Sequence, residues 1–135
     1  MNMIFKIGAL GLFLVFFGCS KNEPIEEGVY SGIFTVKYNV EMSKSWGSGN
    51  GITTLELKNW RYMCTGNPDR IPAGGQGSYS ISKSRIVFNE EHLWLANFDW
   101  GLILHGEYNY KFDGNRLKIT KKTENALYEY DLIKQ

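Results

Sequence analysis

Apolar and polar residues alternate along most of the chain from Gly28 onward. In residues 94–112 every even position is apolar, aromatic or glycine, whereas the odd positions include Asn97, Asp99 and Glu107. A period of two is typical of a strand with one buried face. At about 3.3 Å per residue, however, this run would extend roughly 60 Å, far longer than an ordinary strand. The pattern therefore predicts a strand that is interrupted within the run.

Eight short segments carry the same alternation, and none of them has a helical period or an internal proline. They are residues 28–40, 51–58, 61–65, 77–82, 85–89, 102–112, 115–121 and 126–134. Runs of this length, rich in aromatic and β-branched residues and separated by turn residues, are typical of strands. The chain is therefore expected to be all-β.

The connections between these segments differ in length in a regular way. Residues 59–60, 83–84 and 113–114 are tight, and Asp113-Gly114 is a strong hairpin signal, although Trp60 is a poor residue for a positive φ. Long loops and one short link make up the other connections: 41–51, 66–76, 90–101 and 122–125. In a meander the tight turns then all lie at one end. We predict a single up-and-down antiparallel β-barrel of about eight strands, lipocalin-like, over residues 28–135.

This regular alternation of tight and long connections suggests where the long alternating run of residues 94–112 breaks. We expect residues 102–112 to form the strand and residues 90–101 to fold at the barrel mouth, with Trp94, Phe98 and Trp100 packed inward. The alternative is a ninth strand at residues 93–98. Barrels of eight strands are either filled by side chains or hold one small ligand. The large inward residues favour a filled interior, and Gly32 and Gly106 mark where space or a strand bend is expected.

The N-terminal residues indicate export. Lys6 precedes an apolar stretch at residues 7–17, which is too short to span a bilayer and has the length of a signal peptide. Gly18-Cys19 at its end resembles the bacterial lipoprotein signal, in which the cysteine is lipidated and becomes the first residue; a buried helix before a chance cysteine is the alternative. We expect a signal peptide at 1–18, a lipidated tether at 19–27, and attachment to a membrane of the cell envelope, the outer membrane on its periplasmic or surface face.

Charge and cysteine content narrow the picture further. The chain has 15 Lys and Arg against 14 Asp and Glu, and loss of Lys6 with the signal peptide makes it neutral, which argues against nucleic acid as a partner. Cys64 then has no partner in the chain, so it is either a buried free thiol or part of an intermolecular bridge. Its neighbours Tyr62 and Met63 favour burial.

Four segments together resemble a known group of proteins. They are GVYSGIFTV, GSYSI with RIVF after a turn, WLANFDWGLILHGEYNYKFDGNRLKIT and ALYEYDLIK. They look like the small lipocalin-like lipoproteins of the Bacteroidota, over most of residues 28–134 and most strongly over 94–120. The resemblance implies a barrel and an envelope location, and it brings no catalytic residues.

Residues capable of catalysis are sparse. His105 alternates with Glu107 on one strand face, which suggests either a His–carboxylate pair or a merely exposed polar face. Glu90 and Glu91 with Asp99 would suit a glycosidase-like pair of carboxylates, although a solvated loop uses the same residues. No spacing matches a metal site, which needs about four clustered ligands. We therefore expect a protein that is not an enzyme and has no metal or cofactor.

Aromatic residues at the long loops are the remaining candidates for function. Trp46 lies among small polar residues, and it either folds back over the barrel or shares the open end with Arg70, His92, Trp94 and Trp100 as a ligand-binding set. Loops on a rigid scaffold are where binding usually resides. We expect a non-catalytic binding module for a small apolar or amphipathic ligand. The alternative is a filled barrel that acts on, or inhibits, another envelope protein through its long loops.

Overall fold

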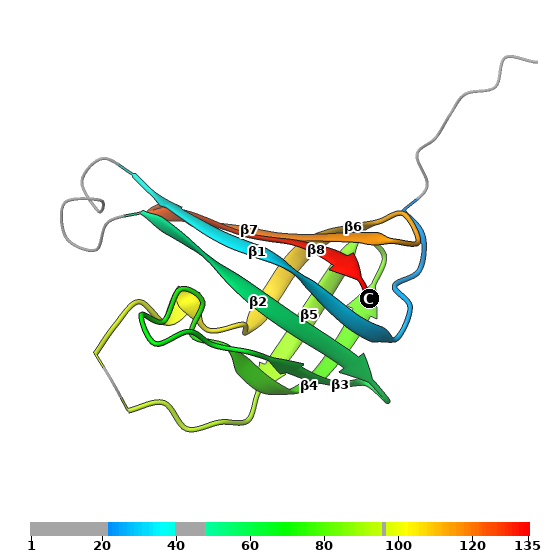
Figure 1. Ribbon diagram of the computed structural model, residues 1–135, viewed down its shortest axis with the longest axis horizontal. Helices are drawn as coiled ribbons and strands as arrows, with labels where there is room; N and C mark the ends of the chain where they lie inside the picture. The colour runs from blue at the N-terminus through cyan, green and yellow to red at the C-terminus, as the bar shows by residue number, and fades with distance from the viewer. Residues whose placement is uncertain (1–21, 40–47, 96) are drawn as a thin grey trace, which may run out of the picture.

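The computed structural model of the chain describes residues 22–39, 48–95 and 97–135. Eight antiparallel strands form a closed barrel in which each strand pairs with its neighbours in sequence and β1 pairs with β8 (Figure 1). The strands are β1 Gly28–Tyr38, β2 Gly49–Lys58, β3 Arg61–Cys64, β4 Gly75–Ser82, β5 Arg85–Glu90, β6 Gly106–Phe112, β7 Arg116–Lys122 and β8 Ala126–Lys134, with a short 3₁₀ helix, η1, at Trp100–Leu102. The predicted up-and-down all-β barrel is confirmed.

The connections divide between two ends of the barrel, as predicted. Residues 59–60, 83–84 and 113–115 form what we call the tight-turn end. Residues 65–74, 91–105 and 123–125 belong to the opposite, long-loop end. Trp60 adopts a φ of 60° despite its size. Its ring lies 5.4 Å from the Tyr79 ring and its carbonyl accepts a 2.9 Å bond from the Tyr79 backbone, so packing against β4 offsets the backbone cost.

A row of aromatic rings crosses the barrel interior. Neighbouring ring centroids along it are 4.6–6.1 Å apart, in the order Tyr62, Phe88, Tyr108, Tyr130 and Phe34. All five side chains are buried, and they come from strands all round the barrel. Rings at these separations are in contact and leave no room for a ligand between them. Gly32 makes no space either, because a Cβ there would lie 2.0 Å from the Asp131 carbonyl oxygen of β8.

Strand β6 is shorter than the predicted strand 102–112. It begins at Gly106, whose φ of 84° bends the chain, and Leu102, Ile103 and Leu104 before it are all buried rather than alternating. This stretch bonds to the β3–β4 connection instead of β5: Leu104 N donates to the Gly74 carbonyl over 2.9 Å. Residues 93–95 and 97–98 are not in a strand, so the alternative of a ninth strand is wrong for the described residues.

Cys64 is a buried free thiol, as the sequence predicted. Its Sγ lies 3.3 Å from Thr53 Oγ1, and burial raises the pKa of the thiol to about 11. A thiol with so high a pKa carries almost no thiolate at neutral pH, so it is chemically inert there.

The Tyr130 hydroxyl is fully buried and lacks a hydrogen-bond partner within the described residues. We expect Tyr130→Phe to raise the free energy of unfolding by about 1 kcal/mol, because it removes an unsatisfied polar group with little change in volume. Tyr30→Phe is the matched control, since this residue is equally buried overall but its hydroxyl donates a 2.5 Å bond to the Glu26 carbonyl. It should lose about 1 kcal/mol in the same denaturant titration. Loss of stability in both variants would contradict the assignment for Tyr130.

Candidate functional site

The β5–β6 connection is the largest element of the long-loop end, and carboxylates hold it at two points. At its start, Glu90 Oε1 accepts a 2.6 Å bond from the His92 backbone, and Oε2 accepts bonds from Gln76 N at 3.0 Å and the Tyr62 hydroxyl at 3.3 Å. Glu90 therefore ties the loop to β3 and β4. This carboxylate is occupied by structural bonds.

Asp99 holds the same connection near its end. The Tyr38 and Tyr128 hydroxyls both donate to Asp99 Oδ2 at 2.6 Å, and Gly101 N donates to Oδ1 at 2.9 Å. Burial, followed by the bond to this carboxylate, raises the pKa of both tyrosines above the ordinary value, so both remain donors at neutral pH. The loop is thereby fixed to β1 and β8, on the far side of the barrel from Glu90.

Between these two anchors lies a row of aromatic and cationic side chains. The His92 and Trp94 rings are 5.5 Å apart, and the Trp94 and Phe98 rings are 5.9 Å apart. The Arg70 guanidinium, from the β3–β4 connection, lies 4.5 Å above the Phe98 ring. Trp94 and Phe98 are partly buried against the core, as the predicted inward packing requires. The row joins the two long loops into one surface.

Leu93 and Leu95 flank Trp94 and point the other way. Their exposed fractions are 77% and 88%, against an inward-facing Trp94. Trp100 is also exposed, at 52%. Three large apolar side chains thus project from one loop that is fixed at both of its ends.

The predicted site residues are distributed unevenly. Arg70, His92 and Trp94 do come together, through Phe98, which was not in the predicted binding set. Trp46 lies outside the described residues. The predicted inward packing of Trp100 is wrong. Its neighbour Gly101 packs so closely on the Tyr128 ring that a Cβ there would lie 2.3 Å from a ring atom, and the side chain before it is directed outward.

Sequence reasoning did not find the roles of Asp99, Leu93 and Leu95. The leucines had a usable signal, because in HLWLA they alternate with the inward Trp94. Asp99 had none, since its two tyrosine partners are 61 and 29 positions away in sequence.

His105 does not form the pair with Glu107 that one interpretation suggested. Its ring Nε2 lies 2.9 Å from the Trp100 carbonyl oxygen, whereas Glu107 pairs with Arg85 over 2.5 Å. Burial, together with the nearby Lys121 ammonium, lowers the pKa of His105. Lys121 Nζ itself donates a 2.7 Å bond to the His105 carbonyl, so both groups serve to close the barrel mouth.

The described residues contain no group of three or more His, Cys, Asp or Glu side chains placed to hold a metal ion. In the same part of the chain, no helix has the length and apolarity needed to cross a bilayer. Comparison of the chain with protein-family models, curated proteins and solved structures finds no match. The geometry of the long-loop end is therefore the basis for a functional argument.

Proposed function

We propose that this protein is a non-catalytic binding module of the cell envelope, held at a membrane by a lipid on Cys19, which binds another envelope protein through its long-loop end. The signal-like residues 1–18 and the resemblance to small envelope lipoproteins support the location. The alternative that the sequence favoured is a small apolar or amphipathic ligand held at the barrel mouth. The filled interior now supports the protein partner instead.

The row of aromatic rings across the barrel is the observation that favours a protein partner over a small ligand. Tyr62, Phe88, Tyr108, Tyr130 and Phe34 occupy the central space in which a barrel of this size would hold a ligand. Two hollows among the described residues lie away from this ring row, one beside β6 and β7 and one beside β2 and β3. Binding at the exposed loops requires no rearrangement of this core.

The loop end is also built to bind with little loss of entropy. Glu90 and Asp99 tie both ends of the β5–β6 connection to the barrel, which limits the conformational freedom of the segment that carries the exposed Leu93 and Leu95. Preorganised loops lose less conformational freedom on association. Exposed apolar side chains that cluster on one surface mark sites of protein–protein contact.

The test is a double variant, Leu93→Ser with Leu95→Ser. We expect it to lower crosslinking of the protein to its partner in envelopes of the producing cell by about tenfold, because anchor residues of interfaces contribute most of the affinity. Crosslinked products would be measured by quantitative mass spectrometry. Stability should be unchanged, since neither side chain is buried.

Ile33→Ser with Ile52→Ser is the matched control, since these exposed isoleucines face each other on the outer wall of β1 and β2. This variant should crosslink like the wild type. Equal crosslinking to the partner by the wild type and both double variants would contradict the assignment of binding to the long-loop end. A discrete bound lipid in native mass spectra of residues 20–135 would replace the protein partner with the small-ligand alternative.

A further inference from the structure

Residues 22–27 lie against the barrel and run across its tight-turn end (Figure 1). Strand β6 extends past Arg85, the first residue of β5, and the N-terminal residues bond to the backbone groups that β5 leaves unpaired. Asn22 Nδ2 donates to the Tyr110 carbonyl over 2.7 Å, Phe112 N donates to Asn22 Oδ1 over 2.7 Å, and Glu23 N donates to the Phe112 carbonyl over 3.0 Å.

Further contacts fix the same segment on the opposite side of this end. Ile25 packs against the core, Glu26 forms an ion pair with Lys134, and Glu27 Oε1 accepts a 2.7 Å bond from Asn59 N in the β2–β3 turn. Asn22, the first described residue, is therefore fixed at the tight-turn end. Cys19 is three residues earlier, so its backbone can lie no more than about 11 Å from Asn22.

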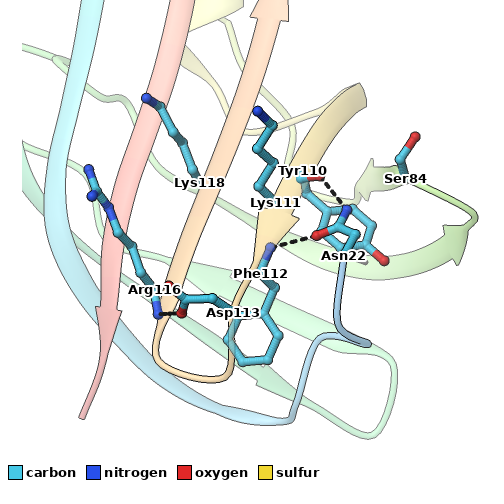
Figure 2. A pocket seen from close by; sticks show the side chains of 8 residues that line it. All are labelled: Asn22, Ser84, Tyr110, Lys111, Phe112, Asp113, Arg116 and Lys118. Atoms are coloured by element: carbon cyan, nitrogen blue, oxygen red, sulfur yellow. Dashed lines mark hydrogen bonds between the residues drawn. The ribbon is translucent and has the colours of Figure 1, made fainter. Parts of the chain in front are cut away.

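A hollow of about 560 Å³ opens directly beside Asn22, between it and strands β6 and β7. Figure 2 shows Lys111 and Lys118 on these two strands with their side chains extending in the same direction, whereas the Phe112 ring points away from them. They are opposite each other in the strand register, an arrangement of like charges that is destabilising by itself.

The charges around this lysine pair are unequally compensated. Lys118 lies 3.5 Å from Glu129, and Arg116 is paired with Asp131. The Asp113 carboxylate accepts bonds from the backbone of the β6–β7 turn. Lys111 has no ion pair within the described residues, so an external anion would complete the arrangement.

We propose that the tight-turn end is the membrane-facing surface of the protein, with Lys111 and Lys118 against the anionic head groups of the bilayer that holds the anchor. This inference rests on the proposed lipidation of Cys19. An acyl chain within about 11 Å of Asn22 brings this end to the bilayer, and a lysine near an anionic surface is attracted to it. The long-loop end then faces away from the membrane, where a partner can reach Leu93 and Leu95.

The experiment places a fluorophore at either end of the lipidated full-length protein. Ser84→Cys labels the tight-turn end, and Leu95→Cys labels the long-loop end; the buried Cys64 will not compete for the thiol reagent. The proteins are reconstituted in phosphatidylcholine vesicles, with or without phosphatidylglycerol, that carry a nitroxide on the lipid head group. We expect several-fold stronger quenching of the label at residue 84, and stronger still with phosphatidylglycerol.

Charge variants then test the role of the lysines. Lys111→Gln with Lys118→Gln should abolish the extra quenching that phosphatidylglycerol causes at residue 84. Lys37→Gln with Lys122→Gln is the matched control, because these exposed lysines flank Leu127 at the other end of the barrel and remove the same charge. It should retain the phosphatidylglycerol effect.

Two failures are distinguishable. If Cys19→Ser leaves the protein in the membrane fraction as before, the lipid anchor itself is wrong. If Cys19→Ser releases the protein but the label at residue 95 is quenched more than that at residue 84, the anchor stands and the orientation is overturned. Equal loss of the phosphatidylglycerol effect in both charge variants overturns the assignment to Lys111 and Lys118.

Discussion

Asp99→Ala is expected to lower the free energy of unfolding by about 3 kcal/mol and to loosen the β5–β6 connection. The change leaves the partly buried hydroxyls of Tyr38 and Tyr128 without the carboxylate that both contact at 2.6 Å. Hydrogen bonds to a charged acceptor each contribute roughly 1.5–3 kcal/mol, and the partial exposure of this site reduces the sum. Denaturant unfolding measures the loss, and amide exchange of residues 97–103 measures the loosening.

Two comparisons make the Asp99 prediction specific. Asp99→Asn keeps an oxygen acceptor and the side-chain volume, so it should lose about 1 kcal/mol. Glu107→Ala breaks only an exposed pair with Arg85 and should stay within about 0.5 kcal/mol of the wild type. If Asp99→Ala and Glu107→Ala lose equal stability, the carboxylate does not hold the loop. Because Leu93 and Leu95 lie on that loop, Asp99→Ala should also weaken crosslinking to the partner.

The barrel itself was predictable because its information is local. A period of two fixes which residues face inward, as in Tyr108, Tyr110 and Phe112 of β6, and turn residues such as Asp113-Gly114 fix the tight hairpins. The alternation of tight and long connections along the chain then assigns each loop to one of the two ends of the barrel. Each of these signals can be read from a few neighbouring residues.

The interruption before β6 was not predictable in the same way. Leu102 and Leu104 fit the alternation of a strand, and only Ile103 shows, by its burial, that the stretch is enclosed on both sides. What ends the strand is the backbone of Gly74, from a different loop, which pairs with Ile103 and accepts a bond from Leu104. A single-sequence pattern contains no information on that distant pairing.

The N-terminal segment illustrates the same limit. SKNEPIEEG is polar, contains proline and has no apolar period, which indicates a solvated tether. Residues 22–27 nevertheless lie against the barrel, because β6 outruns β5 and leaves backbone groups that Asn22 and Glu23 satisfy. Mismatch between two strand lengths is a property of the folded sheet, and it gives a polar segment a binding place that composition does not reveal.

Between about pH 10 and pH 12 the barrel is expected to unfold steeply. Burial raises the pKa of Tyr30 to about 12, and it raises the pKa of Tyr62, Tyr108 and Tyr130 further above the ordinary value. An unfolded tyrosine loses its proton near pH 10. Above that pH the unfolded state binds fewer protons than the folded state, so stability falls as the pH rises; below it, both states are protonated and the contribution is constant.

The size of this effect follows from proton counting. Tyr108 and Tyr130 alone lower the free energy of unfolding by about 3 kcal/mol for each pH unit above 10, and Tyr30 and Tyr62 act in the same direction. A total stability of about 5–15 kcal/mol is therefore exhausted within a few pH units. Tyrosinate absorbance and far-UV circular dichroism, measured together, should change in one step, because the interior tyrosines ionise only on unfolding.

Tyr130→Phe provides the internal comparison for the alkaline transition. It removes one of the buried phenols, so it should make the transition less steep and move its midpoint to higher pH. Tyrosinate absorbance that rises fully while the circular dichroism stays native would mean that water reaches the ring row inside the barrel. A solvent-accessible interior would reopen the case for a ligand there, so this titration tests the filled core on which the choice of a protein partner depends.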